Sequence, residues 1–123
     1  MIIMDREKIF HDWLIYYVKE KLSHDYSEIL INVEGEVHNE FNGHYPDLIL
    51  RSHGLIMGII EVETESTLTL ENAQKWKKLL HQGARLIIIV PERSKAHITD
   101  ILWQVGIAQY VSIGTYDIRL SMP

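Results

Sequence analysis

The chain of 123 residues contains no cysteine. Disulfide bonds, thiolate nucleophiles and cysteine-ligated zinc sites are therefore excluded. The chain also lacks an apolar run long enough to cross a lipid bilayer, so no membrane partner is expected. In the opening segment, MIIMDREK, the charges follow only a very short apolar piece, which differs from a secretory signal peptide. These features predict a cytoplasmic protein.

Basic residues are fewer than acidic ones. The chain has 12 Lys and Arg against 17 Asp and Glu, which gives a formal net charge of −5. Wide, non-specific nucleic-acid binding usually leaves a basic surface, so this balance argues against it while allowing a local basic patch. The composition, 46% hydrophobic and 24% charged, is typical of a soluble globular protein. The length predicts one domain over residues 1–123.

The stretch YPDLILRSHGLIMGIIEVETE, residues 45–65, carries the strongest pattern. Two β-rich apolar runs, 47–51 and 55–62, flank a Ser-His-Gly turn signal and predict a β-hairpin. Asp47 begins the first run, while Glu61 and Glu63 end the second at a spacing that puts both on one face. Carboxylates at the ends of buried strands are unfavourable without a partner, and a divalent cation would be a suitable one.

A metal site in this hairpin imposes a condition on its register. Asp47 and Glu61 share a face only if residues paired across the hairpin have numbers with an even sum. A two-residue turn at His53 and Gly54 pairs Ser52 with Leu55, an odd sum, and separates the two carboxylates. The metal interpretation therefore requires a three-residue turn or a β-bulge, and Gly54 suits either.

The remaining segments predict an α/β fold. Apolar residues recur at helical intervals along residues 5–22, with Asp5 as N-cap. The predicted order is αβββαβαβ, a mixed sheet with helices on both faces. The expected elements after the first helix are a strand at 28–33 continuing towards Val37, the hairpin, a helix at 70–81, a strand at 85–90, a helix at 94–105, and one or two closing strands at 110–113 and 116–120.

The positions of four helical residues predict whether their side chains are buried or exposed. Trp13, Trp76 and Trp103 lie on apolar helical stripes and are predicted to be core residues. His11 lies on the polar side of the first helix and is predicted to be at the surface.

The hairpin and its carboxylates resemble a known nuclease signature. Pro46-Asp47, thirteen intervening residues, and Glu61-Val62-Glu63 at the end of a strand are similar to the PD-(D/E)xK motif of the restriction-endonuclease-like nucleases, which include Holliday-junction resolvases. The element order is similar to the common core of that superfamily. The resemblance implies Mg²⁺- or Mn²⁺-dependent cleavage of DNA by an endo- or exonuclease. It implies Asp47 and Glu61 as metal ligands, with the backbone carbonyl of Val62 as a third.

The same resemblance suggests further catalytic residues. Glu7 matches the place where resolvase-like members carry another acidic residue, although Asp12 and Glu20 lie on the same predicted helix. Gln74 stands where some exonuclease branches place a glutamine on the helix after the motif. We therefore expect Glu7 and Gln74 to lie near the carboxylates.

The motif departs from the family pattern at one position, because Glu63 stands where the family has a lysine. Some restriction enzymes resemble this Glu-x-Glu form, and other branches take a lysine from a neighbouring helix. On a helical wheel Lys77 lies about 40° from the inward-facing Ala73, whereas Lys75 lies about 200° away and faces solvent. Lys77 is therefore the predicted substitute.

Two functions are consistent with the sequence. In the first, carboxylate-held Mg²⁺ activates water for phosphodiester hydrolysis, and Glu63 accepts the water's proton or holds a second ion. Such a nuclease is expected to act on DNA as a homodimer, since the chain offers a small footprint and duplex substrates favour two-fold symmetry. The alternative is a catalytically inactive nuclease fold that serves as a binding or assembly module with a protein partner. A nearby ammonium favours the first, and a Glu63 salt-bridged away from Asp47 favours the second.

Overall fold

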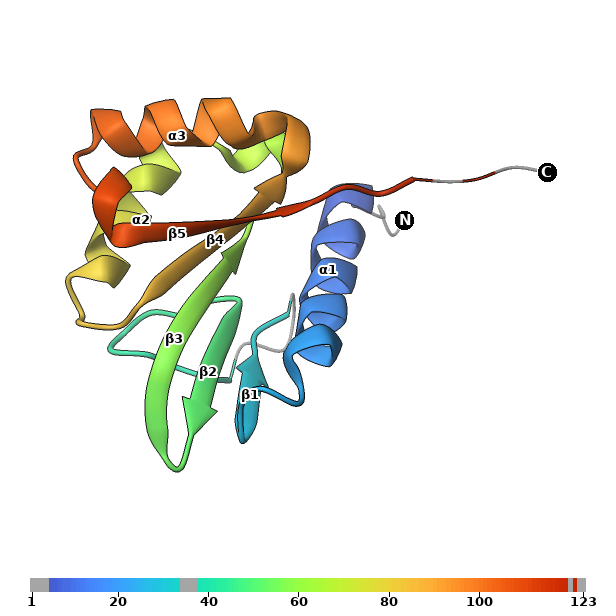
Figure 1. Ribbon diagram of the computed structural model, residues 1–123, viewed down its shortest axis with the longest axis vertical. Helices are drawn as coiled ribbons and strands as arrows, with labels where there is room; N and C mark the ends of the chain where they lie inside the picture. Colours follow the sequence, from blue (N-terminus) through green and yellow to red (C-terminus); the bar gives the residue numbers. More distant parts are fainter. Residues whose placement is uncertain (1–4, 34–37, 120, 122–123) are drawn as a thin grey trace.

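The computed structural model describes residues 5–33, 38–119 and 121, and its centre is a five-stranded mixed sheet (Figure 1). The strands lie in chain order, with β1 to β3 antiparallel and β3 to β5 parallel. The α/β class and the mixed sheet are confirmed, while the restriction-endonuclease-like fold stays a prediction. The elements are α1 (Arg6–Leu22), β1 (Glu28–Ile31), β2 (Leu48–Ser52), β3 (Leu55–Val62), η1 (Glu65–Thr67), α2 (Leu70–Leu80), β4 (Leu86–Pro91), η2 (Glu92–Ser94), α3 (Lys95–Gln104), η3 (Ala108–Tyr110) and β5 (Val111–Tyr116).

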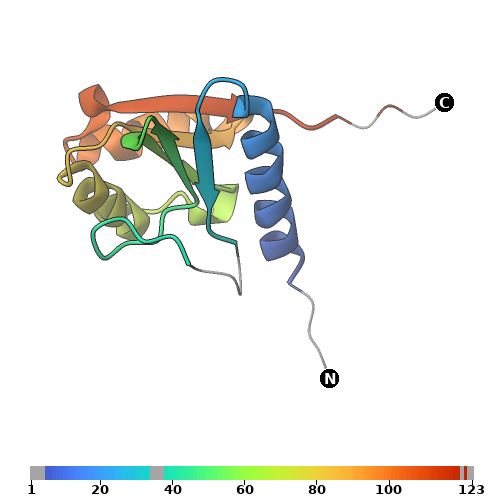
Figure 2. The same ribbon diagram turned by 90° about the horizontal axis from the view of Figure 1, so that it is seen from below.

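Helices cover both faces of the sheet, as Figures 1 and 2 show. Leu14 and Ile15 of α1 pack on one face, and α2 and α3 pack on the other, where Trp76 is fully buried. Along β4, alternate residues enter the two cores, which explains its uninterrupted apolar sequence. The same alternation directs Glu61 and Glu63 towards the α2 side, because Ile59 of β3 packs there.

The predicted ends of the helices agree with the structure, but two of the three tryptophans predicted to be core residues are exposed. Asp5 caps α1 by accepting hydrogen bonds from the N–H groups of Glu7 and Lys8. Trp76 is a core residue as predicted, but Trp13 is 49% exposed and Trp103 is 65% exposed. Apolar periodicity marks a stripe on a helix, but it does not tell whether the fold covers the whole width of that stripe.

A β-bulge resolves the register of the central hairpin. The turn has two residues, His53 and Gly54, both with positive φ, and it pairs Ser52 with Leu55. Between Arg51↔Ile56 and Leu50↔Gly58 the register shifts, which leaves Met57 as the extra residue of β3. The pairing then continues with even sums to Leu48↔Ile60, so the required bulge is confirmed. It lies at Met57 rather than at the turn glycine.

Two predicted segments differ from the structure or extend beyond its described part. The closing region forms one strand, β5, instead of the alternative with two. The predicted continuation towards Val37, and the end of the second closing strand at Leu120, lie outside the described residues.

Candidate active site

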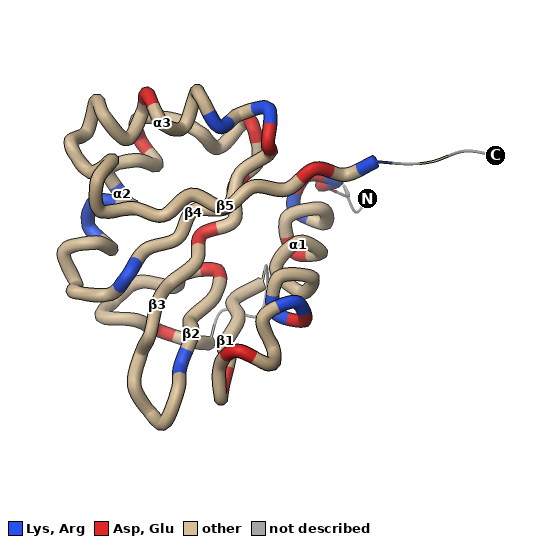
Figure 3. Tube along the Cα trace, in the orientation of Figure 1, with Lys and Arg blue, Asp and Glu red and all other residues tan. Residues whose placement is uncertain are grey.

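Asp47 and Glu61 stand opposite each other where β2 begins and β3 ends. The last paired residues are Leu48 and Ile60, so Asp47 and Glu61 are the next residues in even register. Figure 3 shows acidic positions close together at these two strand ends. The bulge at Met57 therefore brings the two carboxylates together as the sequence condition required.

Glu61 is a buried carboxyl with an unsatisfied oxygen. Only 3% of the residue is exposed, and in the described part of the chain its Oε1 atom has no hydrogen-bond partner. Burial raises the pKa of Glu61 well above its usual value, and the neighbouring charge of Asp47 raises it further. A hydrogen bond from the Asp47 backbone N–H acts in the opposite direction. Without a cation, Glu61 therefore favours its neutral form.

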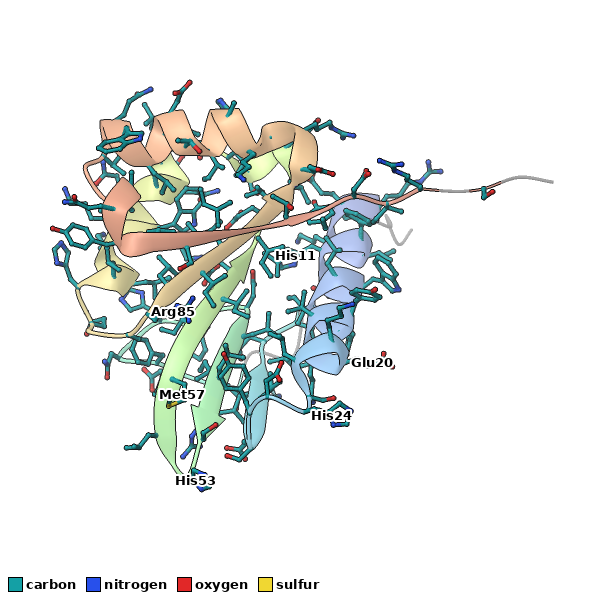
Figure 4. All side chains as sticks on the ribbon, viewed as in Figure 1. His11, Glu20, His24, His53, Met57 and Arg85 are labelled. Atoms are coloured by element: carbon teal, nitrogen blue, oxygen red, sulfur yellow. The ribbon has the colours of Figure 1, made fainter. Side chains whose placement is uncertain are left out.

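Asp47 is held by the end of β3 and by α1. Its Oδ2 atom accepts hydrogen bonds from the Val62 N–H at 2.7 Å and from His11 Nε2 at 3.1 Å. This bond raises the pKa of His11 to about 9, although burial of the ring opposes the shift. Figure 4 shows His11 pointing from α1 towards the sheet. The prediction of a surface histidine is therefore wrong, because half-buried His11 carries a charge that Asp47 stabilises.

Glu63 is fixed by three neighbours. Its Oε1 atom accepts a hydrogen bond from Trp76 Nε1 at 3.2 Å, and the Thr67 hydroxyl also hydrogen-bonds its carboxylate. The Tyr116 hydroxyl donates to the Glu63 backbone carbonyl at 3.0 Å. Burial is the main cause that raises the pKa of Glu63. The carboxylate is thus positioned by neutral donors, and the described residues include no salt bridge to it.

The lysine whose charge acts on the site is Lys75. Its charge lowers the pKa of both Glu61 and Glu63, against the larger effect of burial. For Lys77, the predicted substitute, no interaction with either carboxylate is found within the described ranges 5–33 and 38–119. The helical wheel gives the direction of the Cα–Cβ bond, but a lysine ammonium lies at the end of a flexible four-carbon stem. Exposed Lys75 can therefore influence groups beyond the helix edge.

Glu7 connects α1 to the segment after β3. Its carboxylate accepts hydrogen bonds from the hydroxyls of Ser66 and Thr64, which lower the pKa of Glu7. Thr64 directly follows Glu63, so the predicted proximity of Glu7 to the site is indirect. A groove of about 760 Å³ opens beside this point, lined by residues that include Glu7, Phe10 and Tyr116. Thr64 also lines the groove, so the groove borders the segment that follows Glu63.

The other acidic and amide candidates lie apart from the carboxylates. Gln74 is exposed on α2, and the described residues show no contact between it and Asp47, Glu61 or Glu63. Asp12 contacts His11 Nδ1 at 3.3 Å, whereas Glu20 points outward near the other end of α1 in Figure 4.

The donor set is suited to a divalent cation with two side-chain ligands. Within the described ranges, no group of three or more His, Asp or Glu side chains is placed to share one ion. Glu61 nevertheless has an unpaired buried oxygen, and the charge of Asp47 acts on its pKa, so a cation between these two residues would give that oxygen a partner. The Val62 carbonyl faces the same side of β3 as the N–H that Asp47 accepts from. Asp47, Glu61 and Val62 therefore fit the predicted set.

Comparison with protein-family models, with curated proteins and with solved structures finds no match for the chain. Among residues 5–33 and 38–119, no helix has the length and apolar character needed to cross a membrane.

Without a bound cation, the free energy of unfolding is expected to fall as the pH rises from 4.5 towards 9. The folded chain binds the Glu61 proton more tightly than the unfolded chain, so ionisation above pH 4.5 destabilises the fold. The stabilising charge of His11 is present below pH 6.5 and is lost as the pH approaches 9. Its share should be about 1–2 kcal/mol, less than the full shift implies, because water screens the partly exposed ring.

Urea unfolding in EDTA at pH values of about 5, 7 and 9 measures this trend. A His11→Gln variant should show a smaller decline than wild type between pH 6.5 and 9 and retain the decline that Glu61 causes. A free energy of unfolding that stays constant or rises over the whole range would contradict the expected proton linkage.

Proposed function

We propose that the chain is a metal-dependent phosphodiester hydrolase that acts on DNA, as a homodimer, with Mg²⁺ or Mn²⁺ as its cofactor. The observation that carries this proposal is the buried, unpaired Oε1 atom of Glu61 opposite Asp47. Two such carboxylates at the ends of paired strands repel each other unless a cation or a proton lies between them. The resemblance to the PD-(D/E)xK nucleases supports the choice of substrate and reaction.

The residues of the site have separable roles in this proposal. Asp47, Glu61 and the Val62 carbonyl would hold the cation, and His11 holds the Oδ2 atom of Asp47 from the α1 side. A bound Mg²⁺ supplies charge stabilisation and a more acidic water molecule. Glu63 has a pKa raised by burial and is therefore suited to accept a proton from the attacking water. Lys75 supplies positive charge near both glutamates, the contribution that the family lysine would make.

The alternative, an inactive nuclease fold that binds a partner, is favoured by one observation. His11 already satisfies Asp47 with a charged hydrogen bond, so the fold can neutralise this carboxylate without a metal. Glu63, however, is not salt-bridged away from the site in the described structure, and the charge of Lys75 acts on it. The balance of these interactions supports the hydrolase.

Asp47→Asn is expected to remove cation binding and to lower cation-dependent DNA hydrolysis by more than about 100-fold. Changes to groups that merely orient a metal ligand already reach about that size, and loss of a ligand should exceed it. Mn²⁺ and Mg²⁺ titrations by calorimetry and thermal shift measure binding. Labelled duplex, single-stranded and branched DNA measure cleavage.

The matched control is Asp25→Asn, which neutralises an exposed carboxylate in the turn after α1. It should change neither cation binding nor DNA cleavage. A wild-type chain that binds no cation and cleaves none of the three substrates would replace the hydrolase with the inactive module. Equal cleavage by wild type and Asp47→Asn would exclude this site as the place of reaction.

A further inference from the structure

The outward flank of α1 carries large side chains that the fold leaves half exposed. They are Ile9, Trp13, Tyr16 and Tyr17, each exposed over about half of its surface. Trp13 stacks on Phe10 with 6.1 Å between ring centroids and contacts the Tyr17 ring at 5.7 Å. Its ring is therefore held in one place between two others. Rigid, half-exposed aromatic residues of this kind are typical anchors of protein interfaces.

The residues along this flank follow the spacing of a helix–helix seam. Arg6, Ile9, Trp13, Tyr16 and Glu20 are separated by three, four, three and four positions. This alternation places them on one side of a helix that packs along a partner helix. The seam begins with a cation and ends with an anion, and Glu20 points outward in Figure 4. The opposite side of α1 carries His11 and faces the sheet.

We propose that this flank is the contact surface for a second copy of the chain, with the two α1 helices antiparallel and Trp13 at the two-fold axis. In that arrangement Arg6 of each protomer lies opposite Glu20 of its partner. Ile9 lies at the level of the partner's Tyr17, another half-exposed ring of the flank, so the charge contact and this apolar contact each occur twice, as a two-fold interface requires. A parallel pair would instead place Arg6 against Arg6 and Glu20 against Glu20, which repel.

Charge and location distinguish this surface from a nucleic-acid track. Between Arg6 and Leu22, α1 carries four Lys and Arg and three Asp and Glu, and the charge of His11 is paired with Asp47 on the other side, so the flank lacks the excess of cations that phosphates require. The seam also lies on the flank away from Asp47, so pairing through it leaves the carboxylates uncovered. The inference rests on the homodimer part of the proposed function and is independent of hydrolysis.

Sedimentation equilibrium on the full-length chain tests the surface. Trp13→Ala should raise the dimer Kd by about 30-fold or more, since it truncates the central anchor on both protomers. Arg6→Glu alone and Glu20→Arg alone should each raise Kd by about 10-fold, because each places like charges at both ends of the seam. The double variant Arg6→Glu/Glu20→Arg should return Kd to within about 3-fold of wild type.

Trp103→Ala is the matched control, because it removes another exposed tryptophan, from α3, and should leave Kd unchanged. Circular dichroism checks that each variant is folded, and the charge-swap series remains decisive if Trp13→Ala is not. A wild-type chain that stays monomeric up to about 200 μM would overturn the proposal, since a specific dimer of this kind is expected in the micromolar range. A dimer whose Kd is unchanged by Trp13→Ala and by the single charge substitutions would also overturn the proposal.

A nucleic-acid role for the flank gives a different result. A monomeric wild type that binds a single-stranded oligonucleotide, and loses it in Trp13→Ala, would overturn the dimer in favour of base stacking. Loss of dimerisation in these variants with cation binding retained would confirm the surface whatever the outcome for hydrolysis. Conversely, a chain that dimerises as expected but cleaves no DNA would contradict only the hydrolase.

Discussion

Glu61→Gln is expected to stabilise the cation-free protein at pH 8 by about 1–2 kcal/mol, while lowering cation-dependent hydrolysis by more than about 100-fold. Glutamine has the shape of the protonated side chain but cannot ionise. The folded chain is therefore relieved of the unfavourable buried charge that wild-type Glu61 carries, or must neutralise, at this pH. The same neutrality removes one of the two charged ligands of the proposed cation site. A substitution that raises stability and lowers activity indicates a residue that destabilises the folded protein but is needed for its function.

Urea unfolding in EDTA and cleavage assays in Mn²⁺ measure the two effects on one preparation. The variant should show a smaller decline of stability with pH than wild type. The control is Glu71→Gln, which neutralises an exposed glutamate of α2 and should change neither stability nor cleavage appreciably. Wild-type cleavage combined with reduced stability in Glu61→Gln would identify Glu61 as a structural residue and contradict its role as a ligand.

Trp76→Ala is expected to lower the free energy of unfolding by about 3–5 kcal/mol. Trp76 is fully buried between α2 and the sheet, so truncation leaves a cavity in the larger core. It also removes the indole N–H that donates to Glu63, and a buried carboxyl that loses a donor becomes harder to ionise. This substitution should therefore raise the pKa of Glu63 further as well as destabilise the fold.

Trp76→Phe separates these two effects, because it retains most of the apolar volume and removes only the donor. Its stability loss should be about 1–2 kcal/mol. Trp103→Ala is again the control, and it should lower the free energy of unfolding by less than about 1 kcal/mol because the side chain is largely exposed. Chemical denaturation measures all three. Equal losses for Trp76→Ala and Trp103→Ala would contradict the burial that distinguishes the two positions.

The sequence predicts the elements well because their signals are local. Asp5 as a helix cap, the turn at His53 and Gly54, and the helix starting at Leu70 each depend on a few neighbouring residues. The carboxylates are also predictable, since Asp47 and Glu61 lie on adjacent strands and simple register arithmetic relates them. The need for a bulge followed from that arithmetic, although its position did not.

The features of the site that the sequence does not predict depend on contacts between distant segments. His11 reaches Asp47 only because α1 packs against that end of the sheet. Trp76 was predictable as a core residue, but its hydrogen bond to Glu63 depends on how α2 is oriented on the sheet. One signal was available for His11, since it lies one helical turn after Glu7, which had been assigned to the site. For Lys75, no local pattern showed where its ammonium would lie.

The bulge at Met57 also has a consequence for natural variation among sequences of this type. An insertion or deletion of one residue in the hairpin, with no compensating change, would turn Glu61 away from Asp47 although both residues were still present. A change of two residues would preserve their alignment. In related sequences, the odd or even number of residues between the two carboxylates, considered with any bulge, should therefore be a better indicator of a working site than the presence of the acidic residues themselves.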